Sequence, residues 1–190
     1  MTAAPPKLVV FDCDGTLVDS QHAIVAAMTD AFLSEGLLAP HREAIVGVVG
    51  LSLDIAVAQL VPDGSDRSRI GRLSEAYKAA FAARRRGPDH FEPLYDGVRA
   101  TLERLAARDG VLLGIATGKS RRGVDAVLER EGLARVFATI QTADTHPSKP
   151  HPSMVLAAMD ETGAVPDDTV MIGDTTYDIE MAHGAGAAAI

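Results

Sequence analysis

Cysteine, asparagine and long apolar runs are scarce in this sequence of 190 residues, and each shortage excludes something. The single cysteine, Cys13, cannot form an internal disulfide, and without any asparagine there is no N-glycosylation site. Asp, Gly or Arg interrupts every apolar run before the roughly 18 residues that a membrane helix needs. The first residues, MTAAPPKLVVFD, lack both the charged region and the long apolar region of a secretory signal. We therefore expect a cytoplasmic protein that has no membrane partner.

The sequence also contains fewer basic than acidic residues. Lys and Arg number 18 against 26 Asp and Glu, which gives a net charge of -8. This balance disfavours broad nucleic-acid binding, but it allows a small anionic substrate, because a local pocket can be positive on an acidic protein. The run Arg84-Arg85-Arg86 is better explained as cations in the last turn of a helix, where they complement the helix dipole. We expect no nucleic-acid partner, and either a monomer or a homodimer.

Apolar runs of strand length alternate with helical patterns in much of the chain. The runs cover residues 7–11, 111–116, 136–140 and 169–172, and helical spacing of apolar residues covers 97–108, 120–130 and 153–162. Continuous apolar strands suit a parallel sheet that is buried on both faces. The pattern therefore predicts an α/β fold with a doubly wound parallel sheet, and residues 186–190 read as the opening of a fifth strand.

The interval between the first two runs contains helical patterns only, at residues 21–34, 52–60 and 66–86. We interpret it as a helical insertion that folds over the carboxyl-terminal edge of the sheet. The expected division is a core domain of residues 1–19 and 91–190 and a helical cap domain of residues 20–90. With 190 residues, the chain has room for one main core and one such insertion.

The segment Asp12-Cys13-Asp14-Gly15-Thr16 directly follows the first apolar run. Side chains alternate along a strand, so Asp12 and Asp14 are expected to point the same way and Cys13 the other way. Two carboxylates at the open end of a strand repel each other unless a cation or a shared proton offsets them. The motif therefore indicates a functional site, in preference to a simple turn.

Polar groups follow the other three strands as well, where open α/β sheets bind their ligands. Thr117 can donate a hydroxyl hydrogen bond, and the backbone N–H groups beside Gly118 can bind an anion. Lys149 lies just past the third strand in a stiff, proline-rich loop. Asp174 and Asp178 follow the fourth strand and share a face of a starting helix, where Asp178 could equally serve the helix dipole.

These four segments resemble, in order, the four signature motifs of the haloacid dehalogenase superfamily. The resemblance covers nearly the whole chain, and it is strongest to the phosphoglycolate phosphatase and β-phosphoglucomutase branch. It implies a Rossmann-like core with an all-helical cap. The matching segments are Asp12-Cys13-Asp14-Gly15-Thr16-Leu17-Val18-Asp19-Ser20, Thr117-Gly118, Lys149, and Gly173-Asp174 with Asp178.

The resemblance implies a role for each of these residues. Asp12 would attack phosphorus and form an aspartyl phosphate, and Asp14 would act as general acid and base. Mg²⁺ would lie between Asp12, the backbone carbonyl of Asp14, and Asp174. The phosphoryl oxygens would be bound by Thr117, Gly118 and Lys149. Asp178 would orient the metal shell or Lys149.

Within the superfamily, the resemblance favours a Mg²⁺-dependent phosphatase of small phosphorylated metabolites. Dehalogenases and phosphonatases lack the second Asp, here Asp14, and phosphonatases use a cap lysine, for which only Lys78 is available. A β-phosphoglucomutase-type mutase stays open, since the cap decides between the two, and the cap loop 47–52 is the expected specificity element. A non-catalytic phosphate-binding protein also stays open, because relatives continue through another strand and helix beyond residue 190.

Three readings outside the superfamily fit the residues less well. The segment from Gly114 to Ser120 nearly spells a P-loop, but its glycines are one residue too close together. Cys13 lacks the arginine that cysteine phosphatases carry six positions later, where Asp19 stands. His146 and His151 lack the further ligands of a zinc site.

Overall fold

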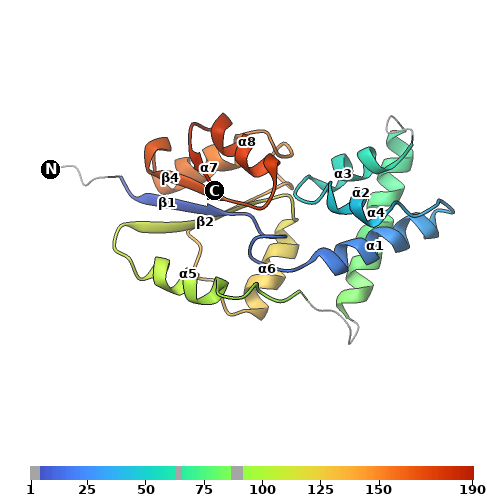
Figure 1. Ribbon diagram of the computed structural model, residues 1–190, viewed down its shortest axis with the longest axis horizontal. Coiled ribbons are helices and arrows are strands. Elements are labelled where there is room, and N and C mark those ends of the chain that lie inside the picture. Colours follow the sequence, from blue (N-terminus) through green and yellow to red (C-terminus); the bar gives the residue numbers. More distant parts are fainter. Residues whose placement is uncertain (1–4, 63–65, 87–91) are drawn as a thin grey trace.

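The computed structural model describes residues 5–62, 66–86 and 92–190, and a parallel sheet forms its centre (Figure 1). The strand order is β3-β2-β1-β4-β5, and every neighbouring pair is parallel. Because β1 lies in the middle and the chain builds first one side and then the other, the sheet is doubly wound, as predicted. The strands are β1 (Lys7–Phe11), β2 (Val111–Thr117), β3 (Thr139–Thr142), β4 (Thr169–Ile172) and β5 (Ala188–Ala189).

Helices cover both faces of the sheet. Helices α7 (Ser153–Thr162) and α8 (Thr176–Gly184) lie on one face, and α5 (Val98–Ala106) and α6 (Arg121–Arg130) lie on the other (Figure 1). The alternation of β1 side chains explains how one strand serves two cores: Leu8 and Val10 pack towards α7 and α8, while Phe11 packs with the helices opposite. A short 3₁₀ helix (Pro166–Asp168) precedes β4.

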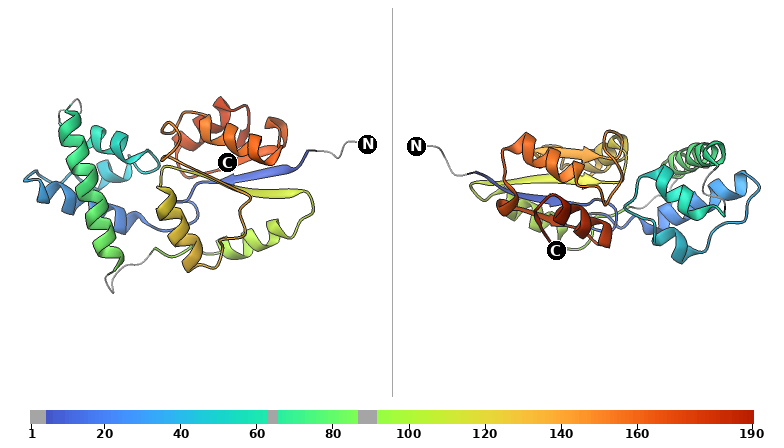
Figure 2. Two further views of the ribbon diagram at one scale, coloured as in Figure 1. Left: turned by 180° about the vertical axis from the view of Figure 1, so that it is seen from behind. Right: turned by 90° about the horizontal axis from the view of Figure 1, so that it is seen from above.

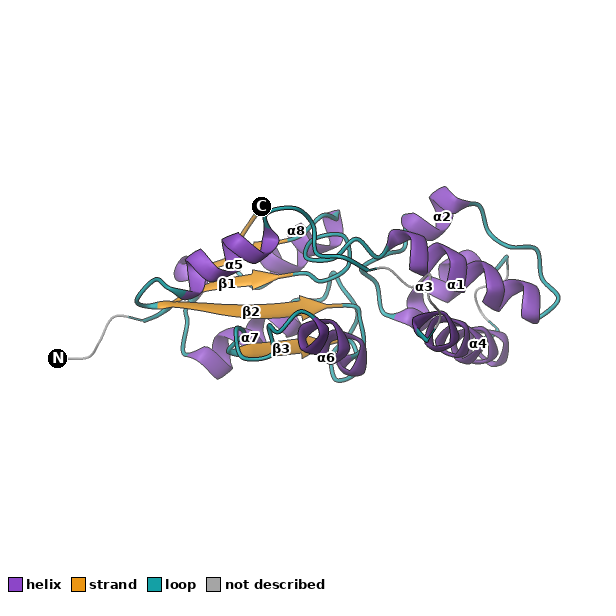
Figure 3. Ribbon diagram, turned by 90° about the horizontal axis from the view of Figure 1, so that it is seen from below, coloured by secondary structure: helices purple, strands orange, loops and turns teal. Residues whose placement is uncertain are grey.

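The helices that the structure describes between β1 and α5 pack on one another, around an apolar cluster of their own. They are α1 (Gln21–Ser34), α2 (Arg42–Val46), α3 (Leu53–Leu60) and α4 (Arg67–Arg85). The buried members of the cluster are Ile24, Met28, Phe32, Ile45, Val49, Val57, Val61 and Leu73. Figures 2 and 3 show these helices, hereafter the helical insertion, beside the carboxyl ends of the strands. The division into two domains stays a prediction, and its second boundary, between residues 90 and 91, lies outside the described part.

One predicted strand is displaced in the structure, and one helix was not predicted. The third strand was expected at 136–140 but is found at Thr139–Thr142. Val136 and Phe137 are in the turn before it and pack from there into the core with Leu133, so their apolar character reflects burial and not strand structure. Helix α2 was not predicted, since five residues are too few to show a helical period.

The predicted fifth strand is confirmed, because β5 pairs in parallel with β4. Within the residues that the structure describes, every helix is too short or too polar to cross a lipid bilayer.

Candidate active site

The predicted site residues lie at the carboxyl ends of the strands. Asp12 directly follows β1, Thr117 ends β2, and Asp174 follows β4 after one glycine. Lys149 reaches the same edge from the loop between β3 and α7. All strands are parallel, so their carboxyl ends meet at one edge, and residues far apart in sequence become neighbours there.

Lys149 bridges two buried carboxylates. Its side chain is 0% exposed, with Nζ 2.9 Å from Asp12 Oδ1 and 2.6 Å from Asp178 Oδ1. The two acids raise the pKa of Lys149 against the effect of its burial, which acts in the opposite direction. Lys149 is therefore a charged group held at a defined place beside Asp12, and contact with Lys149 is one of the two roles that the resemblance implied for Asp178.

Three carboxylates meet around this lysine. Oxygen atoms of Asp12, Asp174 and Asp178 lie within 4.8 Å of one another, which makes the three a possible metal-binding group. If all three are ionised, Lys149 offsets one of the charges and two negative charges remain. A hard divalent cation with a preference for oxygen ligands would balance them. The Asp14 carboxylate does not belong to this group of described residues, and a contribution from the Asp14 backbone carbonyl stays a prediction.

The two carboxylate oxygens of Asp12 differ in their hydrogen bonding. Its Oδ1 accepts from the Cys13 N–H at 2.7 Å and contacts Lys149, whereas Oδ2 is buried without a hydrogen-bond partner in the described structure. Burial raises the pKa of Asp12 to about 6, although the positive charge of Lys149 acts against the rise. An unpartnered buried carboxylate oxygen is costly, and a metal ion or a phosphorus electrophile would relieve it.

Gly15 allows Asp174 to approach the first motif. The backbone at Gly15 has φ 93°, and a Cβ there would lie 2.1 Å from Asp174 Oδ2. Only glycine fits, both for its conformation and for the space. Asp174 reaches the solvent on one side, while its buried side and the nearby Asp178 raise the pKa of its carboxyl group. Its Oδ1 accepts from Thr16 Oγ1 at 3.4 Å.

Asp178 has both of its carboxylate oxygens engaged by protein groups. Oδ1 accepts from Lys149, and Oδ2 accepts from the Thr175 N–H at 3.2 Å and the Thr175 hydroxyl at 2.7 Å. Asp178 thus closes a capping box at the start of α8 while it holds Lys149. The same carboxylate therefore caps the helix and contacts Lys149, and a role in the reaction stays a prediction.

Asp14 lies in a second cluster that sequence reasoning missed. Its Oδ1 accepts from Lys119 Nζ at 2.7 Å, and the same nitrogen lies 3.2 Å from Glu92 Oε1. Asp14 and Glu92 raise the pKa of Lys119 despite its burial. Lys119 stands directly after Thr117-Gly118, and that adjacency was the one available signal. Glu92 carries no sequence signal at all.

The loop at residues 47–52 of the helical insertion lies against the second motif. A Cβ at Gly118 would be 2.4 Å from the carbonyl oxygen of Gly50 and 2.6 Å from that of Leu51. The backbone N–H of Ser52 also donates to Ser148 Oγ at 2.9 Å, one residue before Lys149. The loop therefore lies at the same strand edge as the predicted site residues.

A cavity of about 770 Å³ lies between the helical insertion and the carboxyl ends of the strands, next to the contacts just described. Asp14, Gly118 and Lys119 line it from the sheet side, and the loop 47–52 with Tyr77 and Phe81 lines it from the insertion. Its size is within the range of cavities that bind small molecules.

The structure gives physical reasons against two of the alternative readings. Gly114 lies inside β2, where its Cβ would clash with Thr139, so it belongs to a strand and not to a phosphate loop. Cys13 is buried in an apolar cluster with Val18 and Val127, and burial raises the pKa of its thiol, which disfavours the nucleophilic thiolate.

Solved structures with the same fold include two proteins that are described as predicted phosphatases. The crystal structure of a predicted phosphoglycolate phosphatase from Haemophilus somnus superimposes with a TM-score of 0.84 at 24% identity, over 99% of this chain and 85% of that one. A predicted phosphatase from Clostridium acetobutylicum gives a TM-score of 0.83 at 25% identity, over 98% of this chain and 84% of that one. These similarities support the fold.

Sequence comparison gives the family. The chain is 38% identical to the "Probable phosphatase IndB" of Dickeya dadantii, over 96% of this chain and 79% of that protein. It is 36% identical to a phosphoglycolate phosphatase of Rhodospirillum rubrum, over 95% of this chain and 77% of that protein. The family model for haloacid dehalogenase-like hydrolases matches residues 9–190. The predicted resemblance is thus confirmed, and the chain belongs to the haloacid dehalogenase-like hydrolase family.

Proposed function

We propose that this hydrolase is a Mg²⁺-dependent phosphatase of a small phosphorylated metabolite, a phosphoglycolate-like phosphomonoester, and that it acts through an aspartyl phosphate on Asp12. The observation that carries the proposal is the set of contacts made by the two carboxylate oxygens of Asp12. One of its oxygens is held by Lys149, and the other is buried without a partner. Relatives named as phosphatases support the same reaction class.

In the first half-reaction, Asp12 Oδ2 forms a bond to phosphorus while the bond between phosphorus and the leaving oxygen breaks. Asp14, in its protonated form, gives its proton to that oxygen, which leaves as an alcohol. Lys149 keeps Oδ1 of Asp12 engaged, so Oδ2 is the oxygen that remains for attack. The products of this step are the alcohol, the phosphorylated Asp12 and the Asp14 carboxylate.

In the second half-reaction, the Asp14 carboxylate takes a proton from a water molecule as the oxygen of that water attacks phosphorus. The bond between phosphorus and Asp12 breaks, inorganic phosphate leaves, and Asp14 is protonated again. Lys149, the Thr117 hydroxyl and the backbone N–H groups beside Gly118 would bind the phosphoryl oxygens as negative charge develops on them.

The metal fits the residues that are present. Asp12 and Asp174 offer carboxylate oxygens, and Asp14 offers its backbone carbonyl, whereas Asp178 is occupied by Lys149 and Thr175 and would orient the lysine. When bound, Mg²⁺ would offset the charge of the carboxylates and let an anionic nucleophile approach an anionic phosphate.

We further propose that residues 20–90 act as a cap domain over a core of residues 1–19 and 91–190. The loop 47–52 would then set specificity, because it lies against Gly118 and lines the cavity. The substrate is a small phosphorylated metabolite, with no nucleic-acid partner, and the protein is a monomer or a homodimer.

A panel of phosphorylated metabolites, assayed for phosphate release with Mg²⁺, tests this proposal. We expect release from at least one alkyl phosphomonoester such as 2-phosphoglycolate. Conversion of β-glucose 1-phosphate to glucose 6-phosphate without phosphate release would indicate a mutase. Binding of inorganic phosphate with no turnover on any member of the panel would indicate a non-catalytic protein. Either result would overturn the proposal.

A further inference from the structure

Lys119 is a buried cation that the steps above do not use. Its side chain is 8% exposed, and its Nζ donates to Asp14 Oδ1 at 2.7 Å and to Glu92 Oε1 at 3.2 Å. The Lys119 backbone N–H also donates to Thr117 Oγ1 at 3.2 Å, which fixes the start of the side chain beside the second motif. A lysine anchored in this way contacts the residue that the proposed reaction needs as its acid and base.

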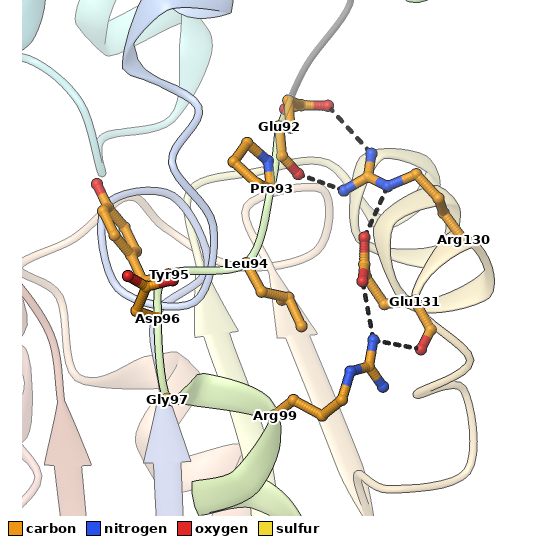
Figure 4. A pocket seen from close by; sticks show the side chains of 9 residues that line it. All are labelled: Glu92, Pro93, Leu94, Tyr95, Asp96, Gly97, Arg99, Arg130 and Glu131. Carbon is orange, nitrogen blue, oxygen red and sulfur yellow. Dashed lines mark hydrogen bonds and ion pairs between the residues drawn. The ribbon is translucent and has the colours of Figure 1, made fainter.

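Glu92 holds the other side of Lys119. Its carboxylate is 0% exposed, with Oε2 3.5 Å from Arg85 Nη2 and 3.9 Å from Arg130 Nη1. Arg130 also donates to the backbone carbonyl of Glu92, and Figure 4 shows the two residues facing each other beside a hollow of about 470 Å³. Glu92 is thus held from α4 and from α6, so its position, and with it that of the Lys119 ammonium, is fixed from two directions.

The helical insertion contributes a further contact to this lysine. Lys119 Nζ lies 5.4 Å from the centre of the Phe81 ring of α4, and Arg85, one turn further on, lies 5.7 Å from the same ring. A cation over an aromatic face is attracted by it. Asp14 therefore sits at the end of a chain of contacts that begins in the helical insertion and passes through Glu92 and Lys119.

An ammonium group has hydrogen-bond donors and no acceptor. Lys119 can therefore bond only to an acceptor oxygen of Asp14. In the protonated form of Asp14 the carbonyl oxygen is the stronger acceptor, so the contact of Lys119 with Oδ1 favours the proton on Oδ2. We propose that Lys119, held by Glu92, is a positioning residue that fixes the Asp14 carboxyl group and assigns proton transfer to its Oδ2. This inference rests on the proposed phosphatase reaction and concerns which residue makes Asp14 effective.

A role in positioning the acid differs measurably from a role in phosphate binding or in stability. A general acid matters most when the leaving group is a poor one, because a good leaving group departs without a proton. Phenyl phosphate and p-nitrophenyl phosphate carry the same aromatic ring, but phenol is the poorer leaving group. A loss of phosphate binding would lower kcat/KM equally for both substrates, whereas a misplaced acid would lower it more for phenyl phosphate.

The experiment measures kcat/KM for both substrates with Mg²⁺. For Lys119→Met we expect a loss that is at least about tenfold larger for phenyl phosphate than for p-nitrophenyl phosphate. Lys119→Arg keeps donors and charge, so it should recover most of that difference. Lys7→Met, at an exposed residue at the start of β1, is the matched control and should behave as wild type.

Because Lys119→Met leaves the buried Glu92 without one cation, it could lower the yield of folded protein. Glu92→Gln keeps the size of the side chain and weakens the hold on Lys119, so it should show the same preference for the better leaving group with a smaller loss. An equal loss on both substrates in Lys119→Met and in Glu92→Gln would overturn the inference while leaving the phosphatase intact. A wild-type protein that hydrolyses neither ester and no member of the metabolite panel would overturn the proposed function, and this inference with it.

Discussion

Two buried lysines each bridge a first-motif aspartate and a second carboxylate, but their surroundings differ. Lys149 holds Asp12 and Asp178, and the exposed Asp174 adds a third carboxylate, so this region has an excess of negative charge. Lys119 holds Asp14 and Glu92, and two arginines approach Glu92 from the outside, so the negative charge of both carboxylates is compensated within this region. The same local pairing therefore leaves one region in need of a cation and the other already balanced.

The difference explains how neighbouring aspartates can take different roles. Among the residues that the structure describes, no group bonds to one of the Asp12 oxygens, as a nucleophile or metal ligand requires. Asp14 is instead bonded to a lysine that is itself anchored, as a group that must be held for proton transfer requires. The four predictions that follow test whether the two regions really divide the chemistry in this way.

The largest effect is expected for the nucleophile. Asp12→Asn should lower the rate of p-nitrophenyl phosphate hydrolysis by at least about 10⁴-fold, because an amide cannot form the acyl phosphate. Asp167→Asn, at an exposed residue of the 3₁₀ helix, makes the same chemical change away from the site and should retain the wild-type rate. Substantial turnover in Asp12→Asn would assign the nucleophile elsewhere.

The next effect concerns the metal and separates the two regions directly. Chelation should stop hydrolysis, and added Mg²⁺ should restore it. In a thermal-unfolding assay, Mg²⁺ should raise the Tm of the wild-type protein and of Lys119→Met, but not of Asp174→Asn, because only the Lys149 region has uncompensated negative charge. A rate that is indifferent to chelation, or a Tm response that survives in Asp174→Asn, would remove the metal from this site.

Replacement of each lysine should also change kcat/KM for the two aryl phosphates in a different pattern. Lys149→Met should lower kcat/KM by about 10³-fold for phenyl phosphate and p-nitrophenyl phosphate alike, because Lys149 would stabilise phosphoryl charge whatever group departs. That uniform loss contrasts with the leaving-group dependence expected for Lys119→Met. If both variants showed the same dependence on the leaving group, the comparison between the regions would fail.

The smallest effect is one of stability against pH in the chelated protein. Burial raises the pKa of Asp12 from 3.8 to about 6, so the folded state holds this proton more tightly than the unfolded state does. The associated stability is present below pH 4 and is lost as the pH rises through about 6. Relative to Asp12→Asn, wild-type protein in chelator should lose up to about 3 kcal/mol of unfolding free energy between these limits.

Urea unfolding of both proteins at several pH values measures that difference. Added Mg²⁺ should reduce it, because a bound cation favours ionised Asp12. A difference that is constant with pH, or one that grows in the opposite direction, would show that Asp12 is not the group that burial perturbs.

Residues at the strand ends were predictable for a general reason. Asp12, Thr117, Lys149 and Asp174 each follow an apolar run, and in a parallel sheet the ends of such runs meet at one edge. The predicted position of β3 was too early, because Phe137 is an apolar residue that packs into the core from the segment before the strand. Residue type alone does not distinguish such a residue from a buried residue within a strand. Helix α2 was missed because it has too few residues for a period.

The sequence by itself determined the order of the strands along the chain, the helical insertion and the four polar segments that meet at the strand ends, because periodicity and residue type express these locally. Only the tertiary structure decided which carboxylate each lysine pairs with. The contact between Asp14 and Lys119 spans 105 positions, and the contact between Lys119 and Glu92 joins β2 to the segment that returns from the helical insertion. Such pairings depend on how two packed units approach each other, and no local pattern of residues encodes that approach.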